Sequence, residues 1–455
     1  MIVFSNLEFI FRFLPVFLIV YYLTPARYKD AILFLGSIFV YAETDLKAAV
    51  LLIAAVVLNF VLGQIVYDDP KKNDAAKRKK AFILILVLDV ALLIACKALA
   101  LFREGFYLPL GISFYLFKMI SYQADLYMDR IKKRPSFIRT AAYFTMFPQI
   151  TQGPIMRYEE GDFDRDRDRR PSLTSFENGL IFFVMGLAFK LLLADRIGVL
   201  WNEILKIGYE SISTPLAWMG AFAYSFQLYF DFWGYSLMAG GVGMMLGFSF
   251  ITNFRHPYAS GSIAEFYRRW HLTLGNWFRD YVYIPLGGSR KGTIRTILNL
   301  LLVWALTGLW HGGTVNFLIW GLALFVLIVL EKFLLGGLFK KVRILGHLYV
   351  WLFIPLTWVV FAISDLGELK MYFERLFPFF GEGVALNPGD YLQYAKIYWP
   401  YFLAAFCLSA VPEIFIRTVR FRKSLPVLLG LTALFWVCVY FAVTQIGNNF
   451  MYFSF

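Results

Sequence analysis

The chain alternates long apolar runs with short polar connections over nearly its whole length. These runs fall at about residues 9–23, 31–42, 46–67, 81–102, 108–127, 176–199, 216–235 with a continuation to 250, 297–309, 317–333, 348–363, 398–416 and 425–443. A helix of about 20 apolar residues crosses a hydrocarbon core of ~30 Å. The pattern therefore predicts an all-α, polytopic transmembrane bundle of about eleven spans.

Residues 140–155 form an apolar stretch that does not fit this rule. A helix of this length reaches only ~24 Å, and Pro148, Gly153 and Pro154 interrupt it. Irregular backbone is tolerated at membrane depth only where protein or a cavity covers it. We therefore expect a re-entrant segment here.

Composition supports a membrane protein and excludes several other classes. Of the 455 residues, 59% are hydrophobic and only 16% are charged, whereas an average soluble domain has about 25% charged residues. A soluble single-core enzyme and a disordered protein are excluded. Cys96, Cys407 and Cys438 all lie in apolar stretches, so we expect neither a disulfide framework nor a metal site.

The basic surplus of +13 would indicate nucleic-acid binding in a soluble protein. Here we expect no nucleic acid, because the cations cluster between apolar runs, where they report topology and contact anionic membrane lipid. Residues 68–80 hold six Lys/Arg, which predicts a cytoplasmic loop and an N-terminus on the outside. Residues 129–139 are basic again.

The first run has no positive n-region or cleavage site and is expected to be a mature span. The charged loop at 156–171 is expected to be solvated, with a metal or phosphate role as the alternative.

Residues 253–295 differ from the rest of the chain because they interleave aromatic and charged side chains. They contain seven Lys/Arg, two acids and two of the four histidines. Apolar residues recur there at three- and four-residue steps: Ile263, Phe266, Tyr267, Trp270, Leu274, Trp277, Phe278 and Tyr281. This spacing predicts an amphipathic helix in the interface or tucked into the protein, with a lipid-surface anchor as the alternative.

His311 stands inside an apolar block, between Trp310 and two glycines. An ionisable residue at membrane depth is a functional candidate, although a lone histidine is also compatible with a hydrogen-bonded core position. The presence of His271 only forty residues away favours chemistry. A neutral imidazole accepts a proton from a hydroxyl that attacks an acyl group. Nearby arginines could meet an anionic substrate, or alternatively phospholipid.

Three motifs in this region carry a resemblance to a known family. They are "LYFDFWGYSLMAGGVGMMLGF" (228–248), "NFRHPYASGSIAEFYRRWHLTLGNWFRDYVYIPLGGSRKG" (253–292) and "GLWHGGTVNFLIWGL" (308–322). Together they closely resemble the membrane-bound O-acyltransferase (MBOAT) family, in its bacterial alginate O-acetyltransferase (AlgI-type) branch. Segments 4–25 and 108–158 are also similar. The resemblance covers about residues 1–335, within one predicted domain of residues 1–455 whose motif-bearing core is about 108–335.

The resemblance implies a fold and a reaction. It implies a helical bundle around a central tunnel, in the bacterial plasma (inner) membrane. Acetyl-CoA would be the acyl donor from the cytoplasm, as a substrate rather than a bound cofactor. The acetyl group would pass to an extracytoplasmic SGNH-type or AlgX/AlgJ-like acetyltransferase that modifies a polysaccharide.

The family pattern also assigns roles to individual residues. His311 occupies the position of the catalytic histidine, acting either as general base or through a transient acetyl-histidine, and His271 is the second essential polar residue, expected to orient or polarise the thioester carbonyl. The remaining expected substrate contacts are Arg268, Arg269, Trp270, Arg279, Asp231 and Trp310, with Asp231 expected to pair with one of the arginines.

Three other functions stay open at this stage. The related DltB-type group transfers D-alanine from a carrier protein to teichoic acid and shares part of the motif, although "YIPLGGSRKG" (283–292) favours the AlgI form. A transporter or flippase of lipid-linked sugars would also use broken helices, and a purely structural membrane partner is the third alternative. Trp233 and Leu237 depart from the AlgI-type pattern, which puts the particular acceptor polymer in doubt.

Overall fold

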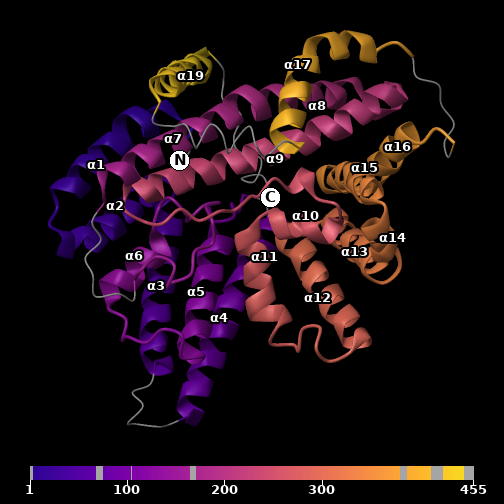
Figure 1. Ribbon diagram of the computed structural model, residues 1–455. Helices are drawn as coiled ribbons and strands as arrows, with labels where there is room; N and C mark the ends of the chain where they lie inside the picture. Colours follow the sequence, from indigo (N-terminus) through magenta and orange to yellow (C-terminus); the bar gives the residue numbers. More distant parts are fainter. Residues whose placement is uncertain are drawn as a thin grey trace. The chain divides into compact units, whose positions relative to one another are not determined.

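The computed structural model describes residues 4–67, 75–103, 105–163, 171–379, 387–410 and 424–444. All regular elements in these ranges are helices (Figure 1), as the apolar pattern predicts. The described residues form two units. Unit 1 comprises those of Met1–Leu187 and Tyr235–Thr252, and unit 2 those of Ala188–Gly234 and Asn253–Thr444.

Within the described residues, six helices have the length and apolar composition needed to cross a membrane. They are Leu46–Val66 (α3), Ala75–Phe102 (α4), Thr293–His311 (α12), Val315–Lys341, Arg343–Ala362 (α15) and Leu425–Thr444 (α19), with Phe9–Leu23 as a shorter apolar helix. These helices make the chain a multi-pass membrane protein. The total of about eleven spans stays a prediction.

Unit 1 holds the N-terminal helices. Its further elements are a π-helical turn at Phe9–Phe13 (η1), then α1 (Leu14–Leu23), α2 (Lys29–Thr44), α5 (Ile112–Tyr127), α6 (Phe137–Thr145) and α7 (Leu173–Ala188). Helices α3, α4 and α5 pack alongside one another (Figure 1). Helix α5 is surrounded by protein, since every side chain from Phe114 to Leu126 is buried.

The segment predicted to be re-entrant contains one short helix. Helix α6 has nine residues, or about 14 Å, and residues 146–156 continue without a helix while remaining buried. Gly111 allows this packing, because a Cβ there would lie 1.9 Å from the Ile150 carbonyl oxygen. Protein therefore covers the irregular backbone, and the segment is too short to span by itself.

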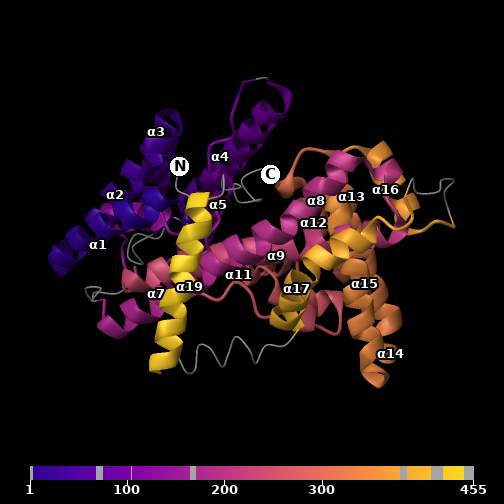
Figure 2. The ribbon, with the colours of Figure 1, turned by 90° about the horizontal axis from the view of Figure 1, so that it is seen from above.

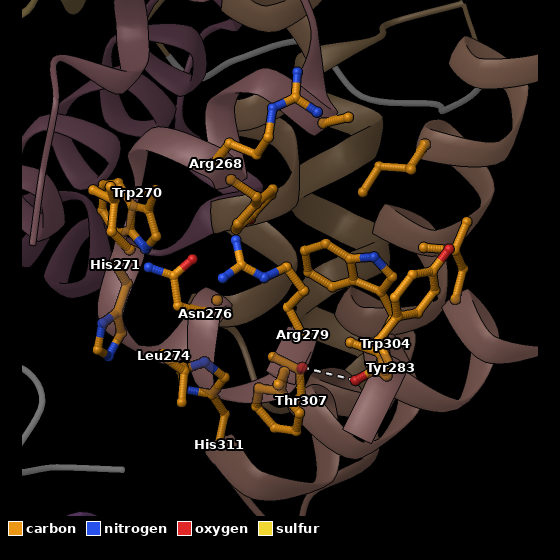
Figure 3. Close-up of a pocket in the computed structure, with 18 of the residues that line it drawn as sticks. Arg268, Trp270, His271, Leu274, Asn276, Arg279, Tyr283, Trp304, Thr307 and His311 are labelled. Atoms are coloured by element: carbon orange, nitrogen blue, oxygen red, sulfur yellow. Dashed lines mark hydrogen bonds between the residues drawn. The ribbon is translucent and has the colours of Figure 1, made fainter. Parts of the chain in front are cut away.

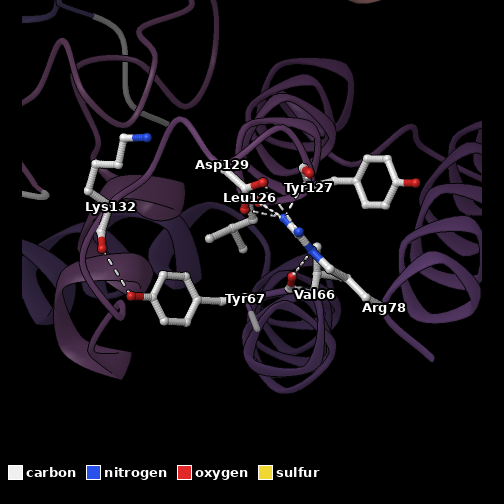
Figure 4. A network of polar contacts seen from close by, with 7 residues as sticks. All are labelled: Val66, Tyr67, Arg78, Leu126, Tyr127, Asp129 and Lys132. Atoms are coloured by element: carbon white, nitrogen blue, oxygen red, sulfur yellow. Dashed lines mark hydrogen bonds and ion pairs between the residues drawn. The ribbon is translucent and has the colours of Figure 1, made fainter. Parts of the chain in front are cut away.

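Arg78, from the first predicted cytoplasmic cluster, ties three helix ends together (Figure 4). Its guanidinium donates to the carbonyl oxygens of Val66 at 2.8 Å and Leu126 at 2.7 Å, and it pairs with Asp129 at 2.6 Å. Nearby, the Tyr67 hydroxyl donates to the Lys132 carbonyl oxygen at 3.0 Å. Both basic clusters thus meet at one end of unit 1. Residues 68–74 of the first cluster and 164–170 of the charged loop lie outside the described residues.

Unit 2 holds the motif-bearing helices (Figure 2). Its elements are a π-helical turn at Phe189–Ala194 (η3), α8 (Asp195–Ile207), α9 (Thr214–Met245, which ends in unit 1), α10 (Ile263–Arg269), α11 (Leu272–Phe278), π-helical turns at Arg279–Tyr283 (η6) and Glu331–Leu335 (η7), α12, α13 (Val315–Leu330), α14 (Gly336–Lys341), α15, α16 (Leu366–Leu376), α17 (Tyr391–Ala410) and α19. Helix α7, the turn η3 and helix α8 follow one another directly along the chain. The segment predicted as a single span at 176–199 is thus part of a longer helical run.

Helices α12 and α13 form the closest pair of unit 2. A Cβ on Gly308 would lie 2.5 Å from the Phe317 carbonyl oxygen, and one on Gly321 would lie 2.4 Å from that of Trp304. Only glycine fits at such a backbone contact. The two helices are therefore locked in register, with His311 at the C-terminal end of α12.

The expectation of one continuous amphipathic helix across residues 263–281 is wrong. Helix α10 ends at Arg269, Trp270 is extended, and His271 adopts left-handed angles of φ 46° and ψ 54° before α11 begins. Two backbone hydrogen bonds hold the break, from Arg255 N to the Arg269 oxygen and from Leu272 N to the Asn253 oxygen, both 2.9 Å. The loop at 253–255 thus replaces the helical hydrogen bonds.

We expect Arg78→Ala to destabilise unit 1 by about 2 kcal/mol, because it removes charge-assisted hydrogen bonds to helix ends that have no other donor within the helix. Thermal unfolding in detergent, followed by far-ultraviolet circular dichroism, measures the loss. Lys79→Ala is the matched control, since Lys79 is exposed on the same turn of α4. Equal unfolding temperatures for the two variants would contradict the assigned role of Arg78.

Candidate active site

His271 and His311 line one cavity of about 400 Å³ in unit 2 (Figure 3). Its walls come from α10, the junction to α11, α11 itself, the turn η6, and helices α12, α13 and α15. The lining is mainly apolar, with Trp304, Trp320 and Trp358 among its side chains. A cavity of this size, with few polar groups, is typical of a small-molecule or acyl-group site.

The position of His271 is fixed by Asn253. The Asn253 side-chain oxygen accepts from the Thr273 backbone N–H at 3.4 Å and lies 3.1 Å from His271 Nδ1. An amide nitrogen could not accept from a backbone N–H, so this atom is the oxygen and His271 Nδ1 must be the donor. In the neutral ring, Nε2 is then an acceptor.

The surroundings of His271 favour this neutral ring. The residue is only 3% exposed, and the Phe232 ring meets it edge-on with centroids 4.7 Å apart. His271 lies outside the six apolar spans, and burial lowers the pKa of its imidazole well below the ordinary value of 6.5. At neutral pH His271 therefore offers a lone pair at Nε2. Donation from Nε2 to a carbonyl oxygen would need a second proton.

His311 is held by aromatic rings at the end of α12. It is 6% exposed, and its ring lies 5.1 Å from that of Trp320 and 5.0 Å from that of Phe361, both near-perpendicular. Thr307, one helical turn earlier, lines the same cavity. The helix ends directly after His311, with Gly312 in an extended conformation. The apolar shell orients the imidazole and keeps bulk water from it.

The three predicted arginines have different surroundings. Arg268 and Arg279 line the cavity, whereas Arg269 pairs with Glu265 at 2.5 Å and does not. Arg279 forms a two-point ion pair with Asp280, at 2.7 and 3.1 Å. Arg268 has no carboxylate partner among the described residues. Arg268 therefore carries the more available charge.

Asp231 does not pair with an arginine of the motif, contrary to the expectation. It lies 2.7 Å from Lys190 Nζ, which is also 2.7 Å from Asp195. Lys190, on the π-helical turn η3, is 1% exposed. A buried carboxylate needs a cation nearby. The cation that meets Asp231 is Lys190, which the sequence places within the apolar run at 176–199. Asp231 is absent from the cavity wall, and its ion pair is with Lys190.

The two predicted tryptophans are placed differently. Trp270 lines the cavity. Trp310 does not, although its ring lies 4.5 Å from the His311 ring. The cavity thus brings together Arg268, Trp270, His271, Arg279 and His311 from the predicted set.

Sequence reasoning missed several residues of this site. Asn276, Tyr283, Thr307 and Trp304 line the cavity, and Asn253 orients His271. Thr307 precedes His311 by four residues, so helical spacing alone would have placed both on one face. Nothing in the local sequence indicates that Asn253 would reach His271, because the contact depends on the unpredicted break.

A second, larger and more polar chamber adjoins the histidine cavity. Its volume is about 1140 Å³, and it shares Arg268, Tyr283 and Ile328 with the cavity. Lys332, Lys340 and Arg343 line it, and none of the three has a carboxylate partner among the described residues. Two acids, Glu265 and Glu331, also line it, but Glu265 pairs with Arg269 and Glu331 accepts from backbone N–H groups. Together with Arg268 the three cations form what we call the cationic chamber. Such a chamber is suited to an anionic ligand.

The described residues contain no group of three or more His, Cys, Asp or Glu side chains that could hold a metal ion.

Comparison with known proteins identifies the family of this chain. The sequence profile of MBOAT, the membrane-bound O-acyltransferase family, matches residues 116–363. The chain belongs to the membrane-bound O-acyltransferase family. It is an acyltransferase, and the resemblance seen in the motifs is confirmed.

Individual relatives place the chain within the family. It is 36% identical over 385 residues to a probable alginate O-acetylase AlgI of Pseudomonas fluorescens, covering 83% of this chain and 76% of the relative. It is 31% identical over 417 residues to a peptidoglycan O-acetyltransferase of Helicobacter pylori, covering 80% and 78%. Similarity to a teichoic acid D-alanyltransferase of Bacillus subtilis is lower, at 29% over 236 residues, covering 49% and 59%.

The tautomer of His271 leads to a pH prediction. Asn253→Asp places a carboxylate beside Nδ1, and the nearby negative charge raises the pKa of His271. If neutral His271 is the active form, the acidic limb of the pH–rate profile moves to higher pH. Thr273→Val is the control, because it removes a different hydrogen bond to Asn253, of 3.0 Å. Higher activity of Asn253→Asp at neutral pH would instead show that the imidazolium is the active form.

Proposed function

We propose that this protein transfers an acetyl group from cytoplasmic acetyl-CoA, across the bacterial plasma membrane, for O-acetylation of an extracytoplasmic polysaccharide. An SGNH-type or AlgX/AlgJ-like acetyltransferase would receive the group outside. The names of the AlgI relatives and of the Helicobacter pylori peptidoglycan O-acetyltransferase support the acetyl group and the polymer class. The D-alanyl alternative is less favoured, because that relative matches only half of this chain.

One observation carries the proposal. Two buried histidines from different elements face a single mainly apolar cavity, and the cationic chamber adjoins it. An acyl-CoA has a neutral thioester at one end and phosphates at the other. The apolar cavity is suited to the thioester and the chamber to the phosphates.

The proposed step is attack of a hydroxyl on the thioester. His311 accepts the hydroxyl proton as the oxygen bonds to the carbonyl carbon, the C–S bond breaks, and the thiolate of CoA leaves and takes up a proton. A route through acetyl-histidine, with His311 as nucleophile, uses the same residue. His271 orients the reacting groups and accepts a hydrogen bond through Nε2.

The first test is His311→Ala, which removes the proposed base. We expect acetylation of the exported polymer to fall at least a hundredfold, with membrane levels of the protein matched by immunoblot. Trp436→Ala is a control, since Trp436 is an exposed side chain on α19. Unchanged acetylation in His311→Ala would contradict the assignment.

The cationic chamber gives a second test, of the donor. The double variant Lys340→Ala, Arg343→Ala should raise the KM for acetyl-CoA about tenfold while leaving the KM for acetyl-pantetheine unchanged, because only the first donor carries phosphates. Lys370→Ala is the matched control, being a lysine on α16 that pairs with Glu374 at 3.6 Å. An equal change for both donors would show that the chamber does not bind phosphate. Turnover with neither donor in the unaltered protein would count against acetyl-CoA itself.

A further inference from the structure

We propose that Glu331 is a positioning residue, which sets where His271 lies relative to His311. The kinetic test of this role rests on the acyl transfer proposed above, whereas the test of His271 reactivity does not. Glu331 is the first residue of the π-helical turn η7. It lines the cationic chamber, but it is neither in the wall of the histidine cavity nor in a recognised motif. π-Helical turns inside long helices are frequent near functional sites.

Glu331 contacts the start of α10 from a distant part of the chain. Its carboxylate oxygen Oε2 accepts from the backbone N–H of Ile263 at 2.7 Å and from that of Ala264 at 3.3 Å. These are the first two N–H groups of α10, which have no carbonyl partner within the helix. Glu331 is 7% exposed. The hydrogen bonds therefore lie in a protected environment, where they are strong.

Helix α10 already has a cap of its own. The Ser262 hydroxyl accepts from the Glu265 backbone N–H at 3.1 Å, and the Glu265 carboxylate accepts from the Gly261 N–H at 3.0 Å. This is a variant of the local capping box that starts many helices. Formation of α10 thus does not require Glu331. What Glu331 adds is a connection between α10 and the helix that precedes η7.

A second contact fixes the same turn from another side. A Cβ on Gly346, in α15, would lie 2.1 Å from the Gly261 carbonyl oxygen. The turn that begins α10 is therefore held by η7 through Glu331 and by the backbone of α15. Because α10 has only seven residues, a shift of this turn is carried directly to its other end, where Arg268, Trp270 and His271 lie.

Helix α13 links this contact to the other histidine. Trp320 on α13 packs against the His311 ring with centroids 5.1 Å apart, and Asn316 donates to the carbonyl oxygens of Val360 and Phe361, at 3.2 and 3.1 Å. Trp320 and Glu331 are separated by eleven positions, or about 16 Å of helix. One helical run therefore contacts His311 near its start and anchors the His271 element at its end.

The experiment compares the distant contact with the local cap in the full-length protein in nanodiscs. Glu331→Ala removes the contact to η7, and Ser262→Ala removes only the local cap of the same helix. We expect Glu331→Ala to lower kcat about tenfold or more, since small misplacements of catalytic groups are costly. The donor is acetyl-pantetheine, which has no phosphate to respond to the charge lost from the chamber, and its KM should change less than about twofold. Ser262→Ala should stay within about threefold of the unaltered enzyme, and Glu331→Gln, which keeps an acceptor oxygen, should recover most of the loss.

A second measurement does not depend on activity. Diethyl pyrocarbonate modifies neutral imidazoles, and mass spectrometry resolves the four histidines of the chain. We expect the modification rate of His271 to rise about fivefold or more in Glu331→Ala and to stay unchanged in Ser262→Ala, because only the first variant removes the hydrogen bonds that join η7 to α10. N-acetylhistidine added to the reaction is the reference for reagent concentration, because His347 lines the same chamber as Glu331.

The outcomes separate this proposal from the proposed function. Equal effects of Glu331→Ala and Ser262→Ala, in kcat or in His271 reactivity, would overturn the positioning role and leave simple helix capping. A loss seen only in KM would overturn it as well. If the unaltered protein turns over no acetyl-CoA, the proposed donor fails, whereas the reactivity of His271 still tests Glu331.

Discussion

Asn253 and His271 share a hydrogen bond across the point where α10 ends and α11 begins, and the geometry of the cavity depends on it. The Asn253 oxygen is bound to Nδ1 of the histidine and to the Thr273 hydroxyl, while the Asn253 backbone oxygen takes up the Leu272 N–H. A non-glycine residue in the left-handed region costs conformational energy. The hydrogen bonds offset that cost, so the strained histidine is held in one orientation and one tautomer.

The apolar surroundings of the chain explain where its surplus of basic residues is used. In an apolar environment a charged group needs a partner within the protein. Lys190 is buried between two aspartates, Arg78 caps helix ends, and Arg279 is neutralised by its neighbour Asp280. The cations that keep no carboxylate partner in the described chain include those of the cationic chamber. Paired charges hold the fold, and those of the chamber are available for a ligand.

The sequence could predict the elements but not their breaks. Apolar periodicity placed α3, α4, α12, α13 and α15 within a few residues, because lipid and core both require apolar faces. It missed the break at His271, since no glycine or proline marks it and the stabilising partners come from the loop at 253–255. It also missed Lys190 as the partner of Asp231, and Glu331. In each case the decisive contact joins residues far apart in the chain, which local pattern does not encode.

The adjoining cavities suggest how transfer and hydrolysis can be kept apart. A thioester in contact with bulk water is lost to hydrolysis, and a site that excludes water protects it. His311 lies among tryptophan and phenylalanine rings, whereas the polar and charged groups of the larger chamber lie beyond Arg268 and Tyr283. Under the proposed function, the ionic part of the donor would stay in the polar chamber while its acyl end enters the apolar cavity. His311, the proposed base, would then contact only a hydroxyl group that enters the apolar cavity. Because α13 contacts His311 and the following turn η7, through Glu331, anchors the element that carries His271, one helical run can hold both histidines around that hydroxyl.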